Sequence, residues 1–534
     1  MTLPDEQHLD LLSSGPEPER PHGRGRLVAL VAAAGLAAGI AGGAVYAGTA
    51  LSGGGAQPED VLPASALGFV KVDLDPSAGQ KLAAYRLAKK FPDSGVEGEG
   101  SIKDDLLRTV LGQEQLDDYD EDVRPWLGAR AGVAFLAPTA AEPDEPVVVA
   151  AVQYTDRAEA RAGLARLAEQ TDEELHFAFA EGQDYVLLAQ DQAVADDAAR
   201  ATEHLSGNPQ FTRGVEALDG DQVALGWTDL AAVWKALPEQ DRQEAFAGEP
   251  AELSGLAVFG AHVTDGTVEV LGRTLDVSAG TSPRLEALFD NPMGRGPSTG
   301  LVRTLPADSL GAFSATGLGA GFSALYDTFR DEVESDEEVR SLVEDLGVTL
   351  PDDLETVLGT ETALSVGGEV LTGEPRIGVR VSTSDPGRAV ELVEGLRDAA
   401  AAPGDGLPQV ADVDVREVDG GWAAAYGMDP ADLTTGTLGD SRVFQRTLPD
   451  AATSGLSYYV DLAGALRQFD EFDRQMAQQY ADDEIGAPPS DTQDEPGLSE
   501  QERRNLEPLQ AFGYTATAQD GGNATFRLRL TVAE

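Results

Sequence analysis

Clusters of Asp and Glu are the first features of this sequence that could do chemistry. Asp73 and Asp75 place oxygen ligands at alternate positions, as calcium-binding loops do, yet Ala78 stands where such a loop needs glycine. Because Asp75 precedes Pro76, we interpret it as the cap of a following helix. Residues 117–122 could bind a divalent cation only weakly, so we expect no specific metal site.

Other catalytic patterns are missing from the sequence. The five histidines are His8, His22, His176, His204 and His262. They form no H-x-x-x-H pair, and the chain has no Cys and no G-x-S-x-G elbow, so the usual zinc, thiol and serine sites are not expected. We therefore expect no cofactor and no catalytic residue of a recognised kind. A hydrolase that uses carboxylates alone remains an alternative, and it would need paired acids with separated pKa values.

Residues 317–321 superficially resemble a phosphate-binding loop. The third glycine at the required spacing and a following Lys-Ser/Thr pair are missing, so we predict a strand-to-helix turn instead. Nucleic acid is also excluded as a partner, because phosphate contacts require a basic surface and the 534 residues carry a formal net charge of −55. We attribute the acidity to a solvated surface, with capture of cations or basic partners as the alternative.

One predicted helix, residues 77–91, carries positive charge in this acidic chain. It contains no Asp or Glu, and its basic residues are Lys81, Arg86, Lys89 and Lys90. These four residues form the candidate site, a contact with anionic lipid head groups or wall polymer in which each contributes about 1 kcal/mol. The alternative is an ordinary surface helix whose lysines favour its C-terminal end. The corresponding later helix, residues 322–334, is acidic, so the fold itself does not require positive charge.

An apolar run relates the chain to a membrane. Residues 27–51 contain no charge, and about 20 such residues cross a bilayer as a helix. Arg24 and Arg26 precede the run and no Lys or Arg closely follows it, so we expect residues 1–26 to form a disordered cytoplasmic tail. The rest of the chain is then extracytoplasmic. A cleaved signal peptide is the alternative, although residues 45–47 form a poor cleavage pattern.

Small residues recur within this run. Gly35, Gly39 and Gly43 have the four-residue spacing by which membrane helices approach closely. The spacing indicates a weak homodimer contact, although a run so rich in Ala and Gly produces it easily by chance.

The sequence also predicts an internal duplication. Leu62-Pro63-Ala64 returns as Leu305-Pro306-Ala307, and further landmarks follow in the same order. A long period of this kind predicts two copies of one domain. The predicted segments are a Gly-rich spacer at 52–60, a first repeat at 61–276, a linker at 277–302, and a second repeat at 303–532 with an acidic mobile insertion at about 480–504.

Each repeat mixes strands and helices. Apolar runs such as 147–154 predict strands, and residues 156–170 have the spacing of an amphipathic helix. Residues 256–263 and 267–274, joined by Asp265-Gly266, predict a hairpin. We therefore predict an α+β fold in which each repeat is a mostly antiparallel sheet with helices on one face.

Short motifs of the first repeat resemble a known family. Leu62-Pro63-Ala64, the segment 72–76 and Trp126-Leu127-Gly128, together with one anchor, are similar to actinobacterial single-pass membrane proteins classed as domain of unknown function thirty-three fifty-two. The resemblance covers most of residues 55–530 and implies a place in the cell envelope of a high-GC Gram-positive organism. The family brings no known reaction, cofactor or catalytic residue.

The expected protein is a single-pass cell-membrane protein with its N-terminus in the cytoplasm. Its extracellular body is expected to be non-catalytic and to bind or scaffold an envelope protein, a lipid or a wall polymer. One alternative is a module that shelters a lipid or another apolar ligand between sheet and helices, and the carboxylate-based hydrolase is the second.

Overall fold

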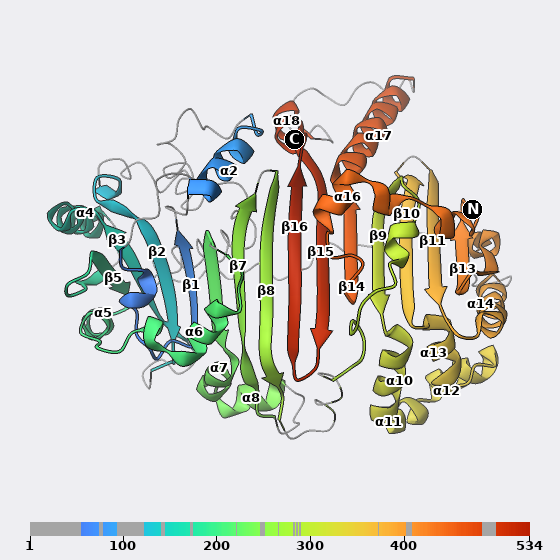
Figure 1. Ribbon diagram of the computed structural model, residues 1–534, viewed down its shortest axis with the longest axis horizontal. Coiled ribbons are helices and arrows are strands. Elements are labelled where there is room, and N and C mark those ends of the chain that lie inside the picture. The colour runs from blue at the N-terminus through green and yellow to red at the C-terminus, as the bar shows by residue number, and fades with distance from the viewer. Residues whose placement is uncertain are drawn as a thin grey trace, which may run out of the picture.

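One antiparallel sheet of sixteen strands organises the computed structural model (Figure 1). The structure describes residues 55–73, 78–92, 122–139, 145–170, 175–220, 222–245, 251–264, 266–280, 284, 287, 290–371, 373–401, 408–482 and 498–533. The fold is α+β, as the sequence predicts, but the strands of both predicted repeats lie in a single sheet.

Two sets of eight strands follow one another along the chain. The first set and its helices are η2 (Pro58–Asp60), β1 (Gly68–Asp73), α2 (Ala78–Ala88), β2 (Leu127–Leu136), β3 (Val147–Tyr154), α4 (Arg157–Gln170), β4 (His176–Phe179), β5 (Tyr185–Ala189), α5 (Gln192–Ala199), η5 (Leu205–Gly207), α6 (Pro209–Glu216), β6 (Ala224–Asp229), α7 (Leu230–Ala236), α8 (Glu239–Ala245), β7 (Ser254–Thr264) and β8 (Thr267–Ser278). The second set is η6 (Leu301–Thr304), β9 (Ser309–Thr316), α10 (Leu318–Thr328), α11 (Arg330–Ser335), α12 (Glu337–Leu346), α13 (Asp352–Leu358), β10 (Glu361–Glu369), β11 (Glu374–Ser382), α14 (Pro386–Ala400), η7 (Pro408–Asp412), β12 (Asp414–Val418), β13 (Gly421–Tyr426), α15 (Asp432–Thr435), η8 (Leu438–Asp440), α16 (Arg442–Thr447), β14 (Leu456–Asp461), α17 (Leu462–Asp482), α18 (Glu500–Leu506), β15 (Leu509–Gln519) and β16 (Asn523–Val532).

The two sets have the same order in the sheet. Read outward from the middle, the first half runs β8-β7-β6-β1-β2-β3-β5-β4 and the second runs β16-β15-β14-β9-β10-β11-β13-β12. Each strand of the first half therefore matches the strand eight places later in the chain. The strands β3 and β11, for example, are both sixth from the middle.

The pairing of β8 with β16 joins the halves. Eight successive residue pairs, from Thr274 with Ala524 to Thr267 with Thr531, stand in antiparallel register. Backbone groups of an interior strand need partners on both sides, and here each half supplies them to the other. The ladder makes the sheet continuous across the middle of the molecule.

Helices cover both faces of the sheet. Face A is the side that carries Phe69 and Trp227, which pack with η5 and α6, while face B carries Val133 and Val152, which pack with α4. The prediction of helices on one face is therefore wrong. The physical reason is that strands such as β3 and β5 are apolar at successive positions, so both of their sides must be buried.

Aromatic contacts hold the face-A core of each half. Trp227, which is 1 % exposed, meets Phe211 of α6 edge-on at 5.6 Å between ring centres, and Phe211 meets Phe69 in the same way at 5.5 Å. In the second half, the ring centres of Phe444 in α16 and Tyr459 in β14 are 5.2 Å apart. The helices α6 and α16 thus dock on matching strands, β6 and β14.

Two predicted segments differ in detail. Residues 55–60 of the predicted spacer belong to the body, because Pro58 and Glu59 of η2 are buried. The predicted insertion at 480–504 is helical at its ends, since α17 extends to Asp482 and α18 begins at Glu500; the residues between 483 and 497 lie outside the described part.

The turn predicted at 317–321 is confirmed. Gly317, with a φ of 67°, separates β9 from α10, and this backbone conformation favours glycine.

The predicted membrane segment lies outside the described residues, as do residues 1–26 and the glycines Gly35, Gly39 and Gly43. None of the described helices combines the length and the apolar character that crossing a bilayer requires.

We call the pairing of β8 with β16 the seam. At the seam, an aromatic ring lies over a glycine. A Cβ added to Gly272 of β8 would lie 1.9 Å from the ring of its partner Phe526 on β16. We expect Gly272→Ala to lower the free energy of unfolding by about 1–3 kcal/mol, because the ring must move away. Urea unfolding followed by circular dichroism measures the change.

Gly395 of α14 supplies the matched control, since nothing lies within 4 Å of a Cβ added there. Gly395→Ala should be neutral or stabilising by up to about 1 kcal/mol. In a Phe526→Ala background the cost of Gly272→Ala should largely disappear. An equal cost in both backgrounds would show that the ring is not the cause.

Candidate functional site

The predicted basic helix is α2, and it lies on face B. Ala83, Ala84 and Leu87 form one buried cluster with Val263 of β7 and Val268 of β8. These small and apolar residues recur at helical spacing, so one side of α2 packs on the sheet. The other side is left for the charged residues.

The structure separates the four candidate residues by role. Arg86 and Lys89 are exposed, and Lys90 is half-buried, where its Nζ donates a hydrogen bond to the backbone carbonyl of Ala533. Lys81 lies in α2, but its side chain is outside the described part of the structure. Lys90 therefore fastens the C-terminal segment, and Arg86 and Lys89 are the described bases that face solvent.

Leu82 belongs to the same outer side of α2. At 50 %, it has the largest exposed fraction of any big apolar side chain among the described residues. It precedes Arg86 by four residues and Lys89 by seven, so the three share one helix face. Exposed apolar residues beside bases are typical of helices that lie in the head-group region of a membrane.

The chain enters the body close to this helix. Gly55, where the description begins, lies against the guanidinium of Arg130, whose Nε is 3.5 Å from Asp73 Oδ2 at the end of β1. Only four residues separate Asp73 from α2. Figure 1 shows α2 and the C-terminus at the same end of the strands. We call this end of the sheet the α2 edge, and it is formed by Asp73, α2 and Val532.

Face A buries a group of charges beside Gly55. Lys71 donates to Glu59 at 2.5 Å, and Arg130 pairs with Asp73; all four side chains are at most 17 % exposed. The hydroxyl of Tyr185 donates to the backbone of residue 56, and burial raises the pKa of this tyrosine. These contacts fix residues 55–60 on the sheet, so we assign them a structural role.

A second buried group lies at the seam between the halves. Glu269 of β8 is 5 % exposed and accepts a hydrogen bond from Arg529 of β16, while Arg527 lies 3.5 Å away. His262 Nε2 is 3.3 Å from the other carboxylate oxygen of Glu269. Burial lowers the pKa of His262; Glu269 opposes this shift and the two arginines add to it. His262 is therefore mainly neutral at pH 7, and the arginines balance Glu269.

Carboxylates that the sequence offered as cation ligands are used in ion pairs. The pairs are Asp73 with Arg130 and Asp122 with Arg166. Across the described ranges, no group of three or more His, Cys, Asp or Glu side chains is arranged to hold a metal ion. These carboxylates therefore neutralise arginines of the protein itself.

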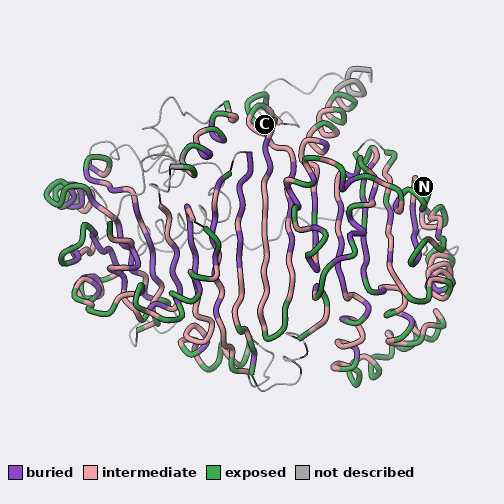
Figure 2. The backbone as a smooth tube through the Cα atoms, viewed as in Figure 1, coloured by how far each residue is buried: buried purple, intermediate pink, exposed green. Residues whose placement is uncertain are grey.

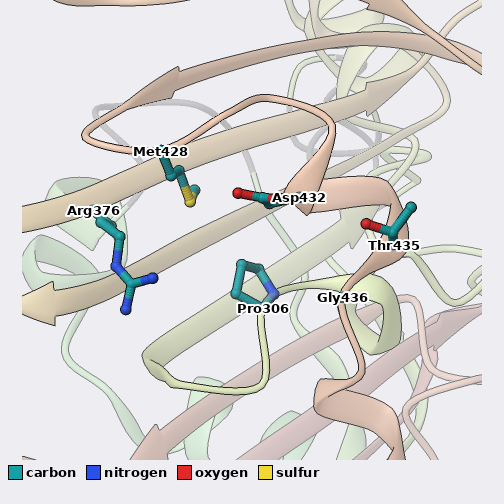
Figure 3. A pocket seen from close by; sticks show the side chains of 6 residues that line it. All are labelled: Pro306, Arg376, Met428, Asp432, Thr435 and Gly436. Carbon is teal, nitrogen blue, oxygen red and sulfur yellow. The ribbon is translucent and has the colours of Figure 1, made fainter.

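A small hollow lies beside β11 in the second half (Figure 3). Its volume is about 210 Å³, and it is lined by Pro306, Arg376, Met428, Asp432, Thr435 and Gly436. Pockets for organic ligands usually enclose ~300–1,000 Å³ and are mostly apolar. The guanidinium of Arg376 already pairs with Asp308. We therefore assign no ligand to this hollow.

Sequence reasoning missed both buried charge groups. Arg527 and Arg529 alternate with apolar residues along β16, a pattern that ordinarily predicts a strand with one wet face. Here Arg529 instead donates to the carbonyl of Arg446 in α16, so a helix lies over the charged side. The available signal was the opposite sign of Glu269 on the corresponding last strand of the first half.

Together these features define a class of protein: an α+β body on one continuous antiparallel sheet, whose buried charges hold its own elements together. The chain belongs to the DUF3352 family, described as a protein of unknown function, and the family profile matches residues 30–401. No curated protein matches the chain.

The seam charges generate a stability prediction. Glu269→Ala should lower the free energy of unfolding by about 3–5 kcal/mol, because partly buried Arg529 loses its counter-charge, while Arg527 keeps its ion pair with Asp450. Glu269→Gln should cost less, since the amide oxygen still accepts a hydrogen bond. Asp520→Ala is the control: Asp520 is fully exposed and pairs with Arg295, so its loss should cost less than about 1 kcal/mol. Equal losses for Asp520→Ala and Glu269→Ala would contradict the structural role of the seam.

Proposed function

We propose that the chain is a single-pass envelope protein whose extracytoplasmic body is a non-catalytic binding module, held with the α2 edge toward the membrane. The observation that carries the proposal is the position of Gly55. It lies against Arg130, at the end of β1 from which α2 also departs. The apolar run ends at Leu51, so the link to Gly55 spans at most about 14 Å when extended. A chain anchored by this run would therefore hold α2 close to the bilayer surface.

A binding role accords with how the titratable side chains are used. Buried acids such as Glu59 and Glu269 are balanced by basic partners, and Glu361 accepts hydrogen bonds from Ser298 and Thr299 at 2.5–2.6 Å. Carboxylates with such partners serve the fold. A general acid instead needs a carboxyl group whose environment keeps its proton near neutral pH.

We further propose that the two halves arose by duplication. The support is the repeated strand order together with matched core contacts, Trp227 with Phe211 and Tyr459 with Phe444. The helix that follows β1 in the first half differs from the helix that follows β9 in the second. In the first half α2 packs on the sheet, whereas in the second α10 packs against α13. The proposed membrane contact is then a property that only one copy acquired.

The anchor is tested by topology. In cells that carry the full chain with an epitope at each end, external protease should degrade the C-terminal epitope and leave the N-terminal one intact, because the run of residues 27–51 keeps the tail inside. Immunoblots of intact and permeabilised cells provide the measurement. A mature N-terminus near residue 48 would show instead that the run is a cleaved signal peptide.

The membrane contact of α2 is tested with anionic vesicles and residues 55–534. Arg86→Ala with Lys89→Ala should weaken binding roughly 30-fold at low salt, because two bases contribute about 2 kcal/mol. The loss should shrink as salt rises. Lys90 is left unchanged because it holds the Ala533 carbonyl. Vesicle co-sedimentation measures the affinity.

Arg200→Ala with Arg330→Ala is the matched control. It removes two positive charges from the C-cap of α5 and from α11, where the side chains of Arg200 and Arg330 are 67 % and 49 % exposed. Equal losses in the two double variants would assign the effect to net charge and remove the contact proposed for α2.

A further inference from the structure

An unbroken row of uncharged side chains crosses face B. Directly paired residues link all sixteen strands, and from one edge of the sheet to the other they are Phe179, Val186, Val152, Ala131, Val72, Ala224, Ala261, Val270, Leu528, Tyr514, Tyr458, Phe313, Leu364, Val379, Ala424 and Val415. Directly opposite residues share a face, so the row is one surface stripe.

Charge is sorted between the two faces. We consider the paired parts of β6 to β11 and β14 to β16, away from the turns. There, every Asp, Glu, Lys, Arg and His side chain points to face A. They are Asp229, His262, Glu269, Arg273, Glu361, Arg376, Arg380, Asp461, Arg527 and Arg529. Face B of these strands is therefore free of charge, in a chain of which 25 % of residues are charged.

The first half covers its part of the row. Ala224 and Ala261 are 3 % and 1 % exposed, and they belong to the cluster that lies under α2. Their small side chains let the helix approach the sheet. Face B is thus an ordinary buried interface on this side of the seam.

The second half leaves its part of the row open. Tyr458 is 42 % exposed, Leu364 is 37 % exposed, and Val366 and Ile377 beside them are 38 % and 44 % exposed. The helix α10 does not cover them, because it packs against α13. Figure 2 shows β16, at the border of this region, as half-buried along most of its length. We define the open face by Phe526, Tyr514, Tyr458, Leu364, Val366 and Ile377.

We propose that the open face binds the hydrocarbon tail of an anionic amphiphile, with its head group at α2. A paired sheet offers no free backbone groups, and the open face adds aromatic and aliphatic side chains without charge, which suits an acyl chain. The helix α2 shares a buried cluster with Val532 of β16, the first strand of the open face. Arg86 and Lys89 therefore stand at its border, where an anionic head group would lie.

Charge and shape argue against the other occupants. A second copy would bring another chain of formal charge −55 against this one. A flat bilayer would meet α4 and α14, which pack on face B on either side of the open strands. A single amphiphile fits between these helices, because the strands from β16 to β11 span about 24 Å at ~4.8 Å per strand.

Photo-crosslinking tests this inference on the full-length protein in nanodiscs of neutral lipid. The probe is a long-chain fatty acid with a diazirine in its tail, compared with a cationic alkylammonium that has the same tail. Mass spectrometry should place the crosslinks in peptides of the open-face strands β16, β15, β14, β9, β10 and β11, with the anionic probe labelling at least about tenfold more strongly. Crosslinks only outside these strands, or equal labelling by the cationic probe, would overturn the proposal.

Substitutions test separately where the tail and the head group of the probe bind. Val366→Glu with Ile377→Glu should reduce labelling at least about tenfold, since a charge against the tail is unfavourable, while both exposed positions tolerate Glu in the fold. Arg86→Ala with Lys89→Ala should weaken only the anionic probe. Met293→Glu is the control, because Met293 is 41 % exposed but lies outside the strands.

Unchanged labelling in the Val366→Glu and Ile377→Glu variant would overturn the proposal, as would crosslinks between two copies in place of the probe. The inference rests on the proposed binding function and does not depend on the anchor. A cleaved N-terminus in the topology assay would remove the anchor and leave this result standing.

Discussion

The hydrogen-bonded ladder between β8 and β16 is the constraint on which the rest of the molecule depends. It joins two eight-stranded sets that otherwise share strand order, and it places Glu269 within reach of Arg527 and Arg529. Arg529 in turn bonds the backbone of α16, so the seam also positions a helix of the second half. An antiparallel pair of equivalent strands is how many symmetric dimers join their sheets. Here the same geometry lies within one chain.

The two faces of the sheet also differ in how they can be covered. Charges on face A are buried but balanced, and each group holds a connecting segment or a helix in place, as Lys71 does for Glu59 of η2. Face B has no charges along its central strands, so only apolar contact can cover it. The first half supplies that cover with α2, and the second half presents larger side chains such as Tyr458 to solvent. Matching positions on face B are thus buried under a helix in the first half and exposed to solvent in the second.

Local patterns in the sequence predicted the elements well and their assembly poorly. The hairpin at Asp265-Gly266, the helix that became α2 and the turn at Gly317 all depend on neighbouring residues, and each is present as β7–β8, α2 and the β9–α10 turn. The single sheet could not be predicted, because the pairing of β8 with β16 joins residues about 260 apart and leaves no local signal. The roles of Lys90 and Glu269 were equally hidden, since the partners Ala533 and Arg529 are distant in the chain.

The lengths of the strands bear on aggregation. The strands that meet at the seam have 12 and 10 residues, whereas the outermost strands β4 and β12 have 4 and 5. A long unpaired strand is a template on which other chains can add, and short or charged edges resist such addition. The two long strands β8 and β16 are therefore paired with each other, and the strands left at the edges of the sheet, β4 and β12, are short. Either half alone would expose a full-length edge strand to which another chain could add, and joining the two in one polypeptide keeps these strands paired.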